Sequence, residues 1–303
     1  MNTVYLDSSL SDDFRRELLY KGQIFTYSNR ANIRALCEFA GEMLREAFHP
    51  LDPLTAQFHM SVERFVEIFG PLKPKFIHHA RTKEIIRAVL SEFGCDLDTT
   101  YQDVPRLRAV TSDAYLTSGV GYAHHLHRDT WYSAPMQQIN WWLPIFEMAS
   151  ESSMAFHPLY WSEPVKNGSA EFNYYEWNRT GRASASQHIK SDTRKQPKPE
   201  QPMELDPQIR FVPEPGGVIL FSAAQMHSTV PNTSGKTRFS IDFRTVHVGD
   251  IKLKKAPPNI DSECTGTSLR DFLKARDLSP MPEDVISVVE PEPVGEGVLV
   301  FKP

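Results

Sequence analysis

Cysteine is scarce in this chain, and long hydrophobic runs are missing. The 303 residues include only three cysteines, Cys37, Cys95 and Cys264, and no two of them have a C-x-x-C spacing. Such a sparse set argues against a cysteine zinc site and favours a reducing compartment. No run of about 18 apolar residues occurs, so no segment has the composition of a transmembrane helix.

An excess of basic charge is also lacking. The chain has 33 lysines and arginines against 38 acidic residues, which gives a formal net charge of -5. This balance argues against nucleic acid or an anionic membrane as a partner. Residues 1–20 mix acidic and basic side chains without an apolar centre, so we expect no signal peptide and a cytoplasmic location. With 40% hydrophobic and 23% charged residues, the composition is that of a globular protein.

The first part of the chain is predicted to be mainly helical. Apolar residues recur at intervals of three and four over residues 28–48, 54–69 and 82–93. Ser28 or Asn29 is expected to cap the first helix, and the Gly70-Pro71 pair is expected to end the second. We therefore assign residues 1–104 to a helical flank.

Short apolar stretches separated by turn-forming residues replace this pattern from about residue 105. The last of them alternates aromatic and aliphatic residues with polar ones, which is typical of a strand with two different faces. Six strands are predicted, over residues 106–111, 137–145, 152–158, 209–212, 217–222 and 237–247. Strands after helices predict a single α+β domain with a sandwich or barrel, interrupted by a polar insert at 160–208 and followed by an extension at 249–303.

Three residues of this second part have the chemistry of a metal site. His127 and Asp129 are two residues apart, so on a strand both side chains point the same way. His227 lies just after the predicted strand 217–222. Two histidines and one carboxylate form the facial triad of non-haem Fe(II) oxygenases, and they leave coordination positions open. We predict these three residues as metal ligands and as the catalytic centre.

Arg238 and Ser240 supply a second group of polar side chains. They follow His227 by 11 and 13 residues and share one face of the last predicted strand. A guanidinium group binds a carboxylate through two parallel hydrogen bonds, and a serine hydroxyl can add a third. This strand is therefore predicted to bind a carboxylate near the metal.

The pattern H-x-D, about a hundred residues, then H-x10-R-x-S resembles the Fe(II)/2-oxoglutarate-dependent oxygenases. The segments Pro215–Phe221 and Trp142–Ile145 look most like the phytanoyl-CoA dioxygenase-like branch of that family. The chain departs from the branch after Phe156, where it reads His-Pro-Leu in place of the usual P-G-S-H turn. The resemblance covers roughly residues 105–248.

This resemblance implies a fold, two cofactors and a reaction. The fold would be a double-stranded β-helix, which is a jelly-roll, cupin-like barrel flanked by the N-terminal helices. The cofactors would be Fe(II) and 2-oxoglutarate, and the reaction would consume O2 and release succinate and CO2. Asp129 favours hydroxylation, desaturation or cyclisation over halogenation, because related halogenases lack this carboxylate. The cosubstrate would contact Arg238 and Ser240, and also Trp142, Thr229 and Gln138.

The substrate is predicted to be a small polar molecule, such as a metabolite of a specialised pathway. The insert carries six basic and two acidic residues between positions 176 and 198, which favours an anionic substrate and a lid over the site. Candidate substrate contacts are Trp131, Tyr132, His157, Arg179, Arg182 and Arg244. Two alternatives stay open: a cupin-like metalloenzyme that needs no 2-oxoglutarate, and a binding protein without turnover on the same barrel.

Overall fold

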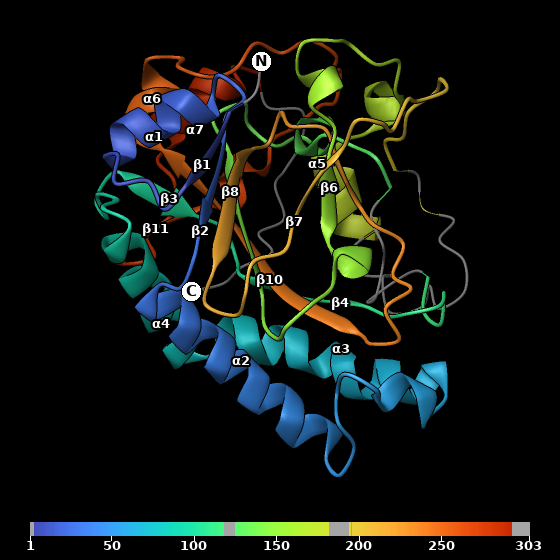
Figure 1. The fold of residues 1–303 in the computed structure, drawn as a ribbon. Coiled ribbons are helices and arrows are strands. Elements are labelled where there is room, and N and C mark those ends of the chain that lie inside the picture. The colour runs from blue at the N-terminus through green and yellow to red at the C-terminus, as the bar shows by residue number, and fades with distance from the viewer. Residues whose placement is uncertain (1–2, 118–124, 182–193, 195, 293–303) are drawn as a thin grey trace.

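The computed structural model describes residues 3–117, 125–181, 194 and 196–292. Its chain forms two β-sheets, with a layer of helices along one side of the larger sheet (Figure 1). The predicted mixture of helices and antiparallel strands is confirmed. The sheets do not close into a barrel over the residues that are described.

The larger sheet contains eight strands drawn from the whole length of the chain. In spatial order they are β1 (Val4–Leu6), β2 (Ile24–Tyr27), β8 (Val218–Ser222), β5 (Ile139–Pro144), β10 (Arg238–His247), β3 (Thr100–Gln102) and β11 (Leu273–Lys274), with β4 (Arg106–Val110) also paired to β10. The β1–β2 pair is parallel, and the other pairs are antiparallel. The smaller sheet consists of β7 (Ile209–Phe211), β6 (Met154–Phe156) and β9 (His227–Thr229).

All six predicted strands are present, as β4, β5, β6, β7, β8 and β10. The sheet also takes strands from both flanking regions, because β1, β2 and β3 lie within residues 1–104 and β11 lies within the C-terminal extension. These added strands have only two to four residues, which is too short for a period of two to be recognised in the sequence.

Alternation along β10 gives the larger sheet two different faces. Phe239, Ile241 and Phe243 pack in the main hydrophobic core, together with the helices α2 (Ala31–Phe48), α3 (Val62–His78) and α4 (Ala80–Glu92). Successive side chains of a strand point to opposite sides, so Arg238, Ser240, Asp242 and Arg244 lie on the opposite side. We call this second side the inner face; it carries the polar residues of the candidate site.

Two predicted helix boundaries are wrong. The second helix does not end at Gly70-Pro71, because α3 runs through Pro71 and Pro74 to His78. Its buried residues Phe69, Leu72 and Phe76 continue the spacing of three and four, so their burial outweighs the cost of the prolines.

The first predicted cap is also incorrect. Helix α2 begins at Ala31, after Arg30, and neither Ser28 nor Asn29 caps it. Instead the carboxylate of Glu92, at the end of α4, accepts hydrogen bonds of 3.0 Å from the backbone amides of Ala31 and Asn32.

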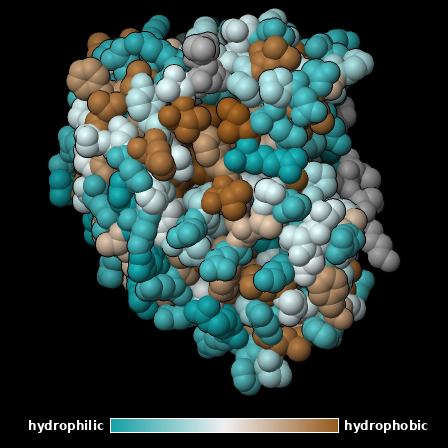
Figure 2. Space-filling view, in the orientation of Figure 1, coloured by the Kyte–Doolittle hydropathy of each residue, from teal (hydrophilic) through white to brown (hydrophobic). Residues whose placement is uncertain are grey.

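The remaining helices are short and lie outside the central layer. They are α1 (Asp12–Leu19), α5 (Tyr174–Glu176), α6 (Val248–Lys252) and α7 (Glu283–Val289). None of the helices in the described ranges is both long and apolar enough to cross a membrane. Figure 2 shows one face of the molecule, where hydrophobic residues form small groups within a mainly hydrophilic surface.

Candidate metal site

The two halves of the predicted triad are joined by backbone hydrogen bonds. The backbone amide of each of His127 and His227 donates to the carbonyl of the other at 3.0 Å. This pairing places the segment 127–129 beside the start of β9, and the two imidazole centroids are 4.3 Å apart. Asp129 begins a short 3-10 helix, Asp129–Tyr132, which turns its carboxylate towards both rings.

The three side chains come close enough to share one metal ion. Asp129 Oδ1 lies 3.3 Å from His127 Nε2 and 3.9 Å from His227 Nε2. One donor atom from each residue can be chosen so that all lie within 4.8 Å of one another. Both histidines are buried. The sequence therefore located three residues that the fold brings together from positions 100 apart.

Hydrogen bonds orient both imidazole rings. His127 Nδ1 lies 2.7 Å from the carbonyl oxygen of His125, and His227 Nδ1 lies 2.9 Å from that of Gln225. A carbonyl oxygen only accepts, so each Nδ1 carries the proton and each Nε2 presents a lone pair. Histidines that bind metals are typically held by such a bond from the other ring nitrogen.

The pKa values of His227 and Asp129 agree with a metal site. Burial, and then the nearby His127, lower the pKa of His227 to about 4, so its imidazole is neutral at pH 7. Burial alone would raise the pKa of the Asp129 carboxyl, but interactions with His127, His227 and Asn140 lower it to about 2. Two neutral imidazoles and one carboxylate are the protonation states that metal binding requires.

The side-chain amides of Asn140, on β5, and of Gln138, the residue before β5, bind the second carboxylate oxygen of Asp129. Asn140 Nδ2 donates to Asp129 Oδ2 at 2.8 Å, and Gln138 Nε2 donates to it at 3.3 Å. Gln138 was predicted to lie near the cosubstrate, and in the structure it contacts Asp129, one of the predicted metal ligands. Asn140 was not predicted, although its place two residues before Trp142 puts it on the same face of the strand.

Arg128, between the two ligands of the H-x-D segment, ties the site to three other parts of the chain. Its side chain is only 1% exposed. Nε donates to Asp261 Oδ2 at 3.0 Å, and Nη1 donates to the carbonyl of Ala224, before His227, at 2.6 Å. Nη2 donates to the carbonyls of Tyr160 and Glu163 in the insert. No sequence signal predicted this residue.

The other end of the inner face holds the predicted carboxylate-binding group. Arg238 is 6% exposed; its Nη1 donates to the carbonyl of Ser152 at 3.2 Å, and its guanidinium lies 5.2 Å from the ring centroid of Trp142. Arg238 Nε and Ser240 Oγ are both buried without a hydrogen-bond partner among the described residues. Buried polar atoms normally have a hydrogen-bond partner, so two unpartnered atoms on the same face of β10 indicate a place for a ligand.

Two of the remaining predicted contacts lie close to the metal site. Thr229 is half-buried at the end of β9, opposite Met154 of β6. Tyr132 is half-buried; its ring lies 5.5 Å from that of His127, and its hydroxyl donates to the carbonyl of Pro197 at 3.2 Å. The insert therefore reaches the metal site at Pro197.

Other predicted substrate contacts are less accessible or more distant. Trp131 is fully buried and donates through Nε1 to Asp261 at 2.8 Å. His157 is buried against Ser228, and its Nδ1 has no partner in the described part of the chain. Arg179 is exposed on the π-helix Trp177–Gly181, whereas Arg182 lies outside the described residues. Arg244 lies on the inner face, opposite Asn140.

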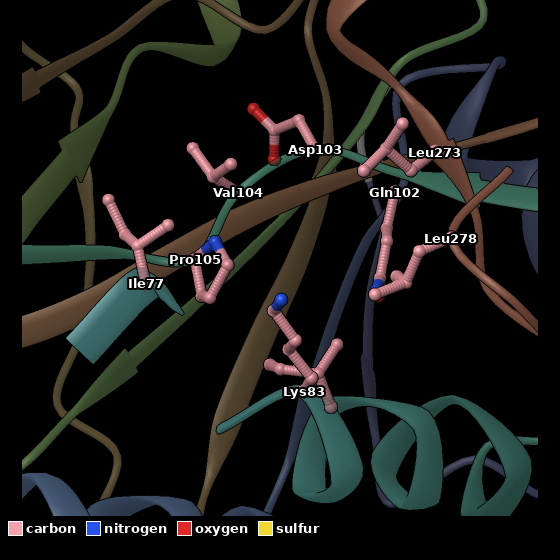
Figure 3. A pocket seen from close by; sticks show the side chains of 9 residues that line it. Ile77, Lys83, Gln102, Asp103, Val104, Pro105, Leu273 and Leu278 are labelled. Carbon is pink, nitrogen blue, oxygen red and sulfur yellow. The ribbon is translucent and has the colours of Figure 1, made fainter. Parts of the chain in front are cut away.

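A separate small cavity lies between α4 and the residues that follow β3 (Figure 3). Lys83 reaches towards Pro105 there (Figure 3). Its lining is mainly apolar and consists of Ile77, Lys83, Ile86, Gln102, Asp103, Val104, Pro105, Leu273 and Leu278. We assign no function to this cavity, because the triad, Arg238 and Ser240 do not line it.

No family model matches the chain, and no curated protein matches it. Solved structures are similar to it at low identity. One is described as the non-heme monooxygenase ThoJ in its apo form, with 12% identity, a TM-score of 0.40, and coverage of 72% of this chain and 70% of ThoJ. Another is the epimerase SnoN in complex with Fe3+, alpha ketoglutarate and nogalamycin RO, with 14% identity, a TM-score of 0.41, and coverage of 90% and 98%.

A third similar structure is EvdO2 from Micromonospora carbonacea var. aurantiaca complexed with 2-oxoglutarate. It shares 12% identity with a TM-score of 0.35, and the match covers 57% of this chain and 62% of EvdO2. The chain thus spans less than two thirds of EvdO2.

Proposed function

We propose that the protein is an Fe(II)- and 2-oxoglutarate-dependent oxygenase that hydroxylates a small polar metabolite. The observation that carries this proposal is the pair of buried, unpartnered atoms, Arg238 Nε and Ser240 Oγ, on the same inner face as a His-Asp-His triad. The two sheets would then be the two halves of a double-stranded β-helix. The motifs around Trp142 and His227 favour the phytanoyl-CoA dioxygenase-like branch.

The donor set fits Fe(II). Two imidazole nitrogens and one carboxylate oxygen suit non-haem iron better than a structural zinc site, which is normally closed by four protein ligands. His127, Asp129 and His227 would hold the ion. Asn140 and Gln138 would keep Asp129 Oδ2 occupied, so that Oδ1 is the oxygen left for the metal.

The other end of the inner face fits the distal carboxylate of 2-oxoglutarate. Arg238 would bind it through charge-assisted hydrogen bonds, and Ser240 would donate its hydroxyl. Trp142 lies against the guanidinium and would limit its movement. A carboxylate at this position would accept hydrogen bonds from Arg238 Nε and Ser240 Oγ. It would also balance the charge of the Arg238 guanidinium, which forms no ion pair with the described residues.

Iron with bound 2-oxoglutarate supplies the oxidising chemistry, in which one oxygen atom of O2 enters a substrate C–H bond, the other enters succinate, and CO2 is released. The residues of the chain position these reactants and keep bulk water away. Backbone carbonyls accept from Nδ1 of both His127 and His227, so that Nε2 of each ring is the nitrogen directed to the metal. Asp129 stays ionised because neighbouring groups lower its pKa.

An anaerobic titration with Fe(II) and 2-oxoglutarate tests this proposal. We expect the weak visible metal-to-ligand charge-transfer band of a bidentate 2-oxoglutarate complex in the wild-type protein. The band should be absent in His127→Ala and retained in His59→Ala, which removes an exposed histidine of the helical region.

Two other results would redirect the assignment. Iron binding without the band would contradict the 2-oxoglutarate assignment and favour a cupin-like metalloenzyme. A protein that binds no iron would contradict the triad assignment itself. If the band forms, release of succinate in the presence of O2 distinguishes an enzyme from a binding protein without turnover.

A further inference from the structure

We propose that Arg106, Arg108 and Arg244 form a binding site for an anionic group of the substrate, a carboxylate or a phosphate. This inference rests on the proposed function, because it assigns the substrate side of the same centre. It is carried by three observations on the inner face: the position of the arginines next to the triad, their fixed orientation, and their remaining exposure.

The strand register places these arginines beside the metal site. Arg244 of β10 is directly opposite Asn140 of β5, and Asn140 donates to Asp129. Directly opposite residues of an antiparallel pair have Cβ atoms about 4.5–5.5 Å apart. On the other side of β10, Arg106 of β4 is opposite Asp242, and Arg108 is opposite Ser240. One continuous polar surface therefore runs from the triad to the outer edge of β4.

Two aspartates hold the three guanidinium groups in a row. Arg106 pairs with Asp103, and Arg244 bridges from Asp103 at 3.2 Å to Asp242 at 3.3 Å. Arg108 completes the row with two hydrogen bonds to Asp242, of 2.7 and 3.3 Å. Because each cation is already fixed, a ligand would not have to order these long side chains on binding.

The arginines keep donors for a ligand. Each guanidinium has five N–H bonds, and the ion pairs use only part of them. The side chains of Arg106, Arg108 and Arg244 are 20%, 28% and 18% exposed. Within the described residues, none of their nitrogens is both buried and without a hydrogen-bond partner.

The local charge favours an anion. Three guanidinium groups face two carboxylates in the row. A third carboxylate, Asp271, acts on Arg106 but already accepts a hydrogen bond from Tyr174. Lys73 of α3 interacts electrostatically with Arg108 and Asp242, but burial lowers its pKa to about 7, so it adds only part of a positive charge at pH 7.

The smaller sheet packs through a hydrophobic cluster on the part of the inner face formed by β5 and β8. Its residues Met154 and Phe156 pack against Trp142, Ile219 and Phe221, which belong to β5 and β8. No residue of β4 belongs to that cluster. The row of arginines therefore continues the inner face beside this hydrophobic cluster.

The test uses small aromatic probes with protein that is loaded with Mn(II) and saturated with 2-oxoglutarate. Proton relaxation by Mn(II) reports whether a probe binds near the metal, independently of turnover. We expect benzoate or phenyl phosphate to be relaxed in a saturable manner, and neutral benzamide not to be. A response to benzoate alone would identify a carboxylate site, and a response to phenyl phosphate alone would identify a phosphate site.

Two variants and a matched control locate the site. Arg106→Gln and Arg108→Gln should each weaken binding of the anionic probe at least tenfold, because a charge-assisted hydrogen bond is lost. Each leaves its aspartate paired with Arg244, so the fold should persist. Arg64→Gln, which removes an exposed arginine of α3, should have no effect.

Equal binding of benzoate and benzamide, or unchanged affinity in both arginine variants, would overturn the inference. Mn(II) and 2-oxoglutarate affinities are measured in every variant, and probe binding is compared at saturating concentrations of both. If the wild-type protein binds neither cofactor, the proposed function fails, and calorimetric titration of the metal-free protein with the same probes still tests the anion site.

Discussion

Arg128 and Arg238 are both buried arginines next to the candidate site, and their surroundings differ. Arg128 donates to the Asp261 carboxylate and to three backbone carbonyls. Arg238 donates to a single carbonyl, stacks on Trp142 and leaves Nε unpartnered. Burial lowers the pKa of Arg238 to about 10.

This difference indicates that Arg128 stabilises the fold, whereas Arg238 binds a ligand. A buried guanidinium such as that of Arg128, with four of its five N–H groups donating to the protein, holds backbone segments in place. One that is only partly satisfied carries a desolvation cost that an incoming anion can remove. The metal end of the inner face is therefore built to be rigid in the absence of ligand, whereas the Arg238 end is completed by ligand.

The largest expected effect is on stability at the metal end. Arg128→Met should lower the free energy of unfolding by about 3–5 kcal/mol, because it leaves Asp261 as a buried charge without its partner. Urea unfolding of the metal-free protein measures this change. The double variant Arg128→Met/Asp261→Asn should recover part of the loss, and a loss below about 1 kcal/mol in the single variant would refute the scaffold role.

The matching change at the other end should affect ligand binding instead. Arg238→Met should weaken 2-oxoglutarate binding about ten- to a hundredfold, as expected for loss of hydrogen bonds from a charged group. It should leave Fe(II) affinity unchanged and stability equal or higher. Calorimetric titration of 2-oxoglutarate into Ni(II)-loaded protein provides the measurement, and a large loss of stability would show that Arg238 is also scaffold.

A smaller effect is expected from Ser240. Ser240→Ala should weaken 2-oxoglutarate binding by roughly fivefold, because a neutral hydrogen bond contributes about 1 kcal/mol. The same change removes an unpartnered buried hydroxyl, so the melting temperature of the ligand-free protein should rise slightly. A fall in melting temperature would mean that this hydroxyl has a partner in the free protein.

The smallest effect concerns protonation at the metal end. An NMR titration of the metal-free protein should show His227 with a midpoint near pH 4, because burial and His127 lower its pKa. The unfolded chain takes up this proton near pH 6.5, so the contribution of His227 to stability falls as the pH decreases from about 6.5 to 4. An ordinary midpoint near 6.5 would contradict the buried, neutral imidazole.

Local patterns in the sequence predicted six of the strands and the three residues of the triad. Alternation along residues 238–245 identified β10 and the shared face of Arg238 and Ser240. The H-x-D spacing identified His127 and Asp129, because two residues on one face can be recognised without knowledge of the fold. The same period of two in residues 106–109 places Arg106 and Arg108 on one face of their strand.

Contacts between distant segments could not be predicted in this way. Arg128 and Asp261 are 133 positions apart, and neither lies in a pattern that indicates the other. The end of α3 was missed because burial of Phe76 depends on the sheet beneath it, whereas the Gly70-Pro71 signal is local. Both cases need the tertiary packing that a single sequence does not display.

The tie between Arg128 and Asp261 has a consequence for the order in which the protein matures. All three metal-ligand candidates have been synthesised once the chain reaches residue 227, but Asp261 is added 34 residues later. Until then the Arg128 guanidinium has no carboxylate partner and can donate only to backbone carbonyls. A chain that stops after β10 would contain every ligand and yet lack the ion pair that orders them, so the C-terminal extension completes the metal site.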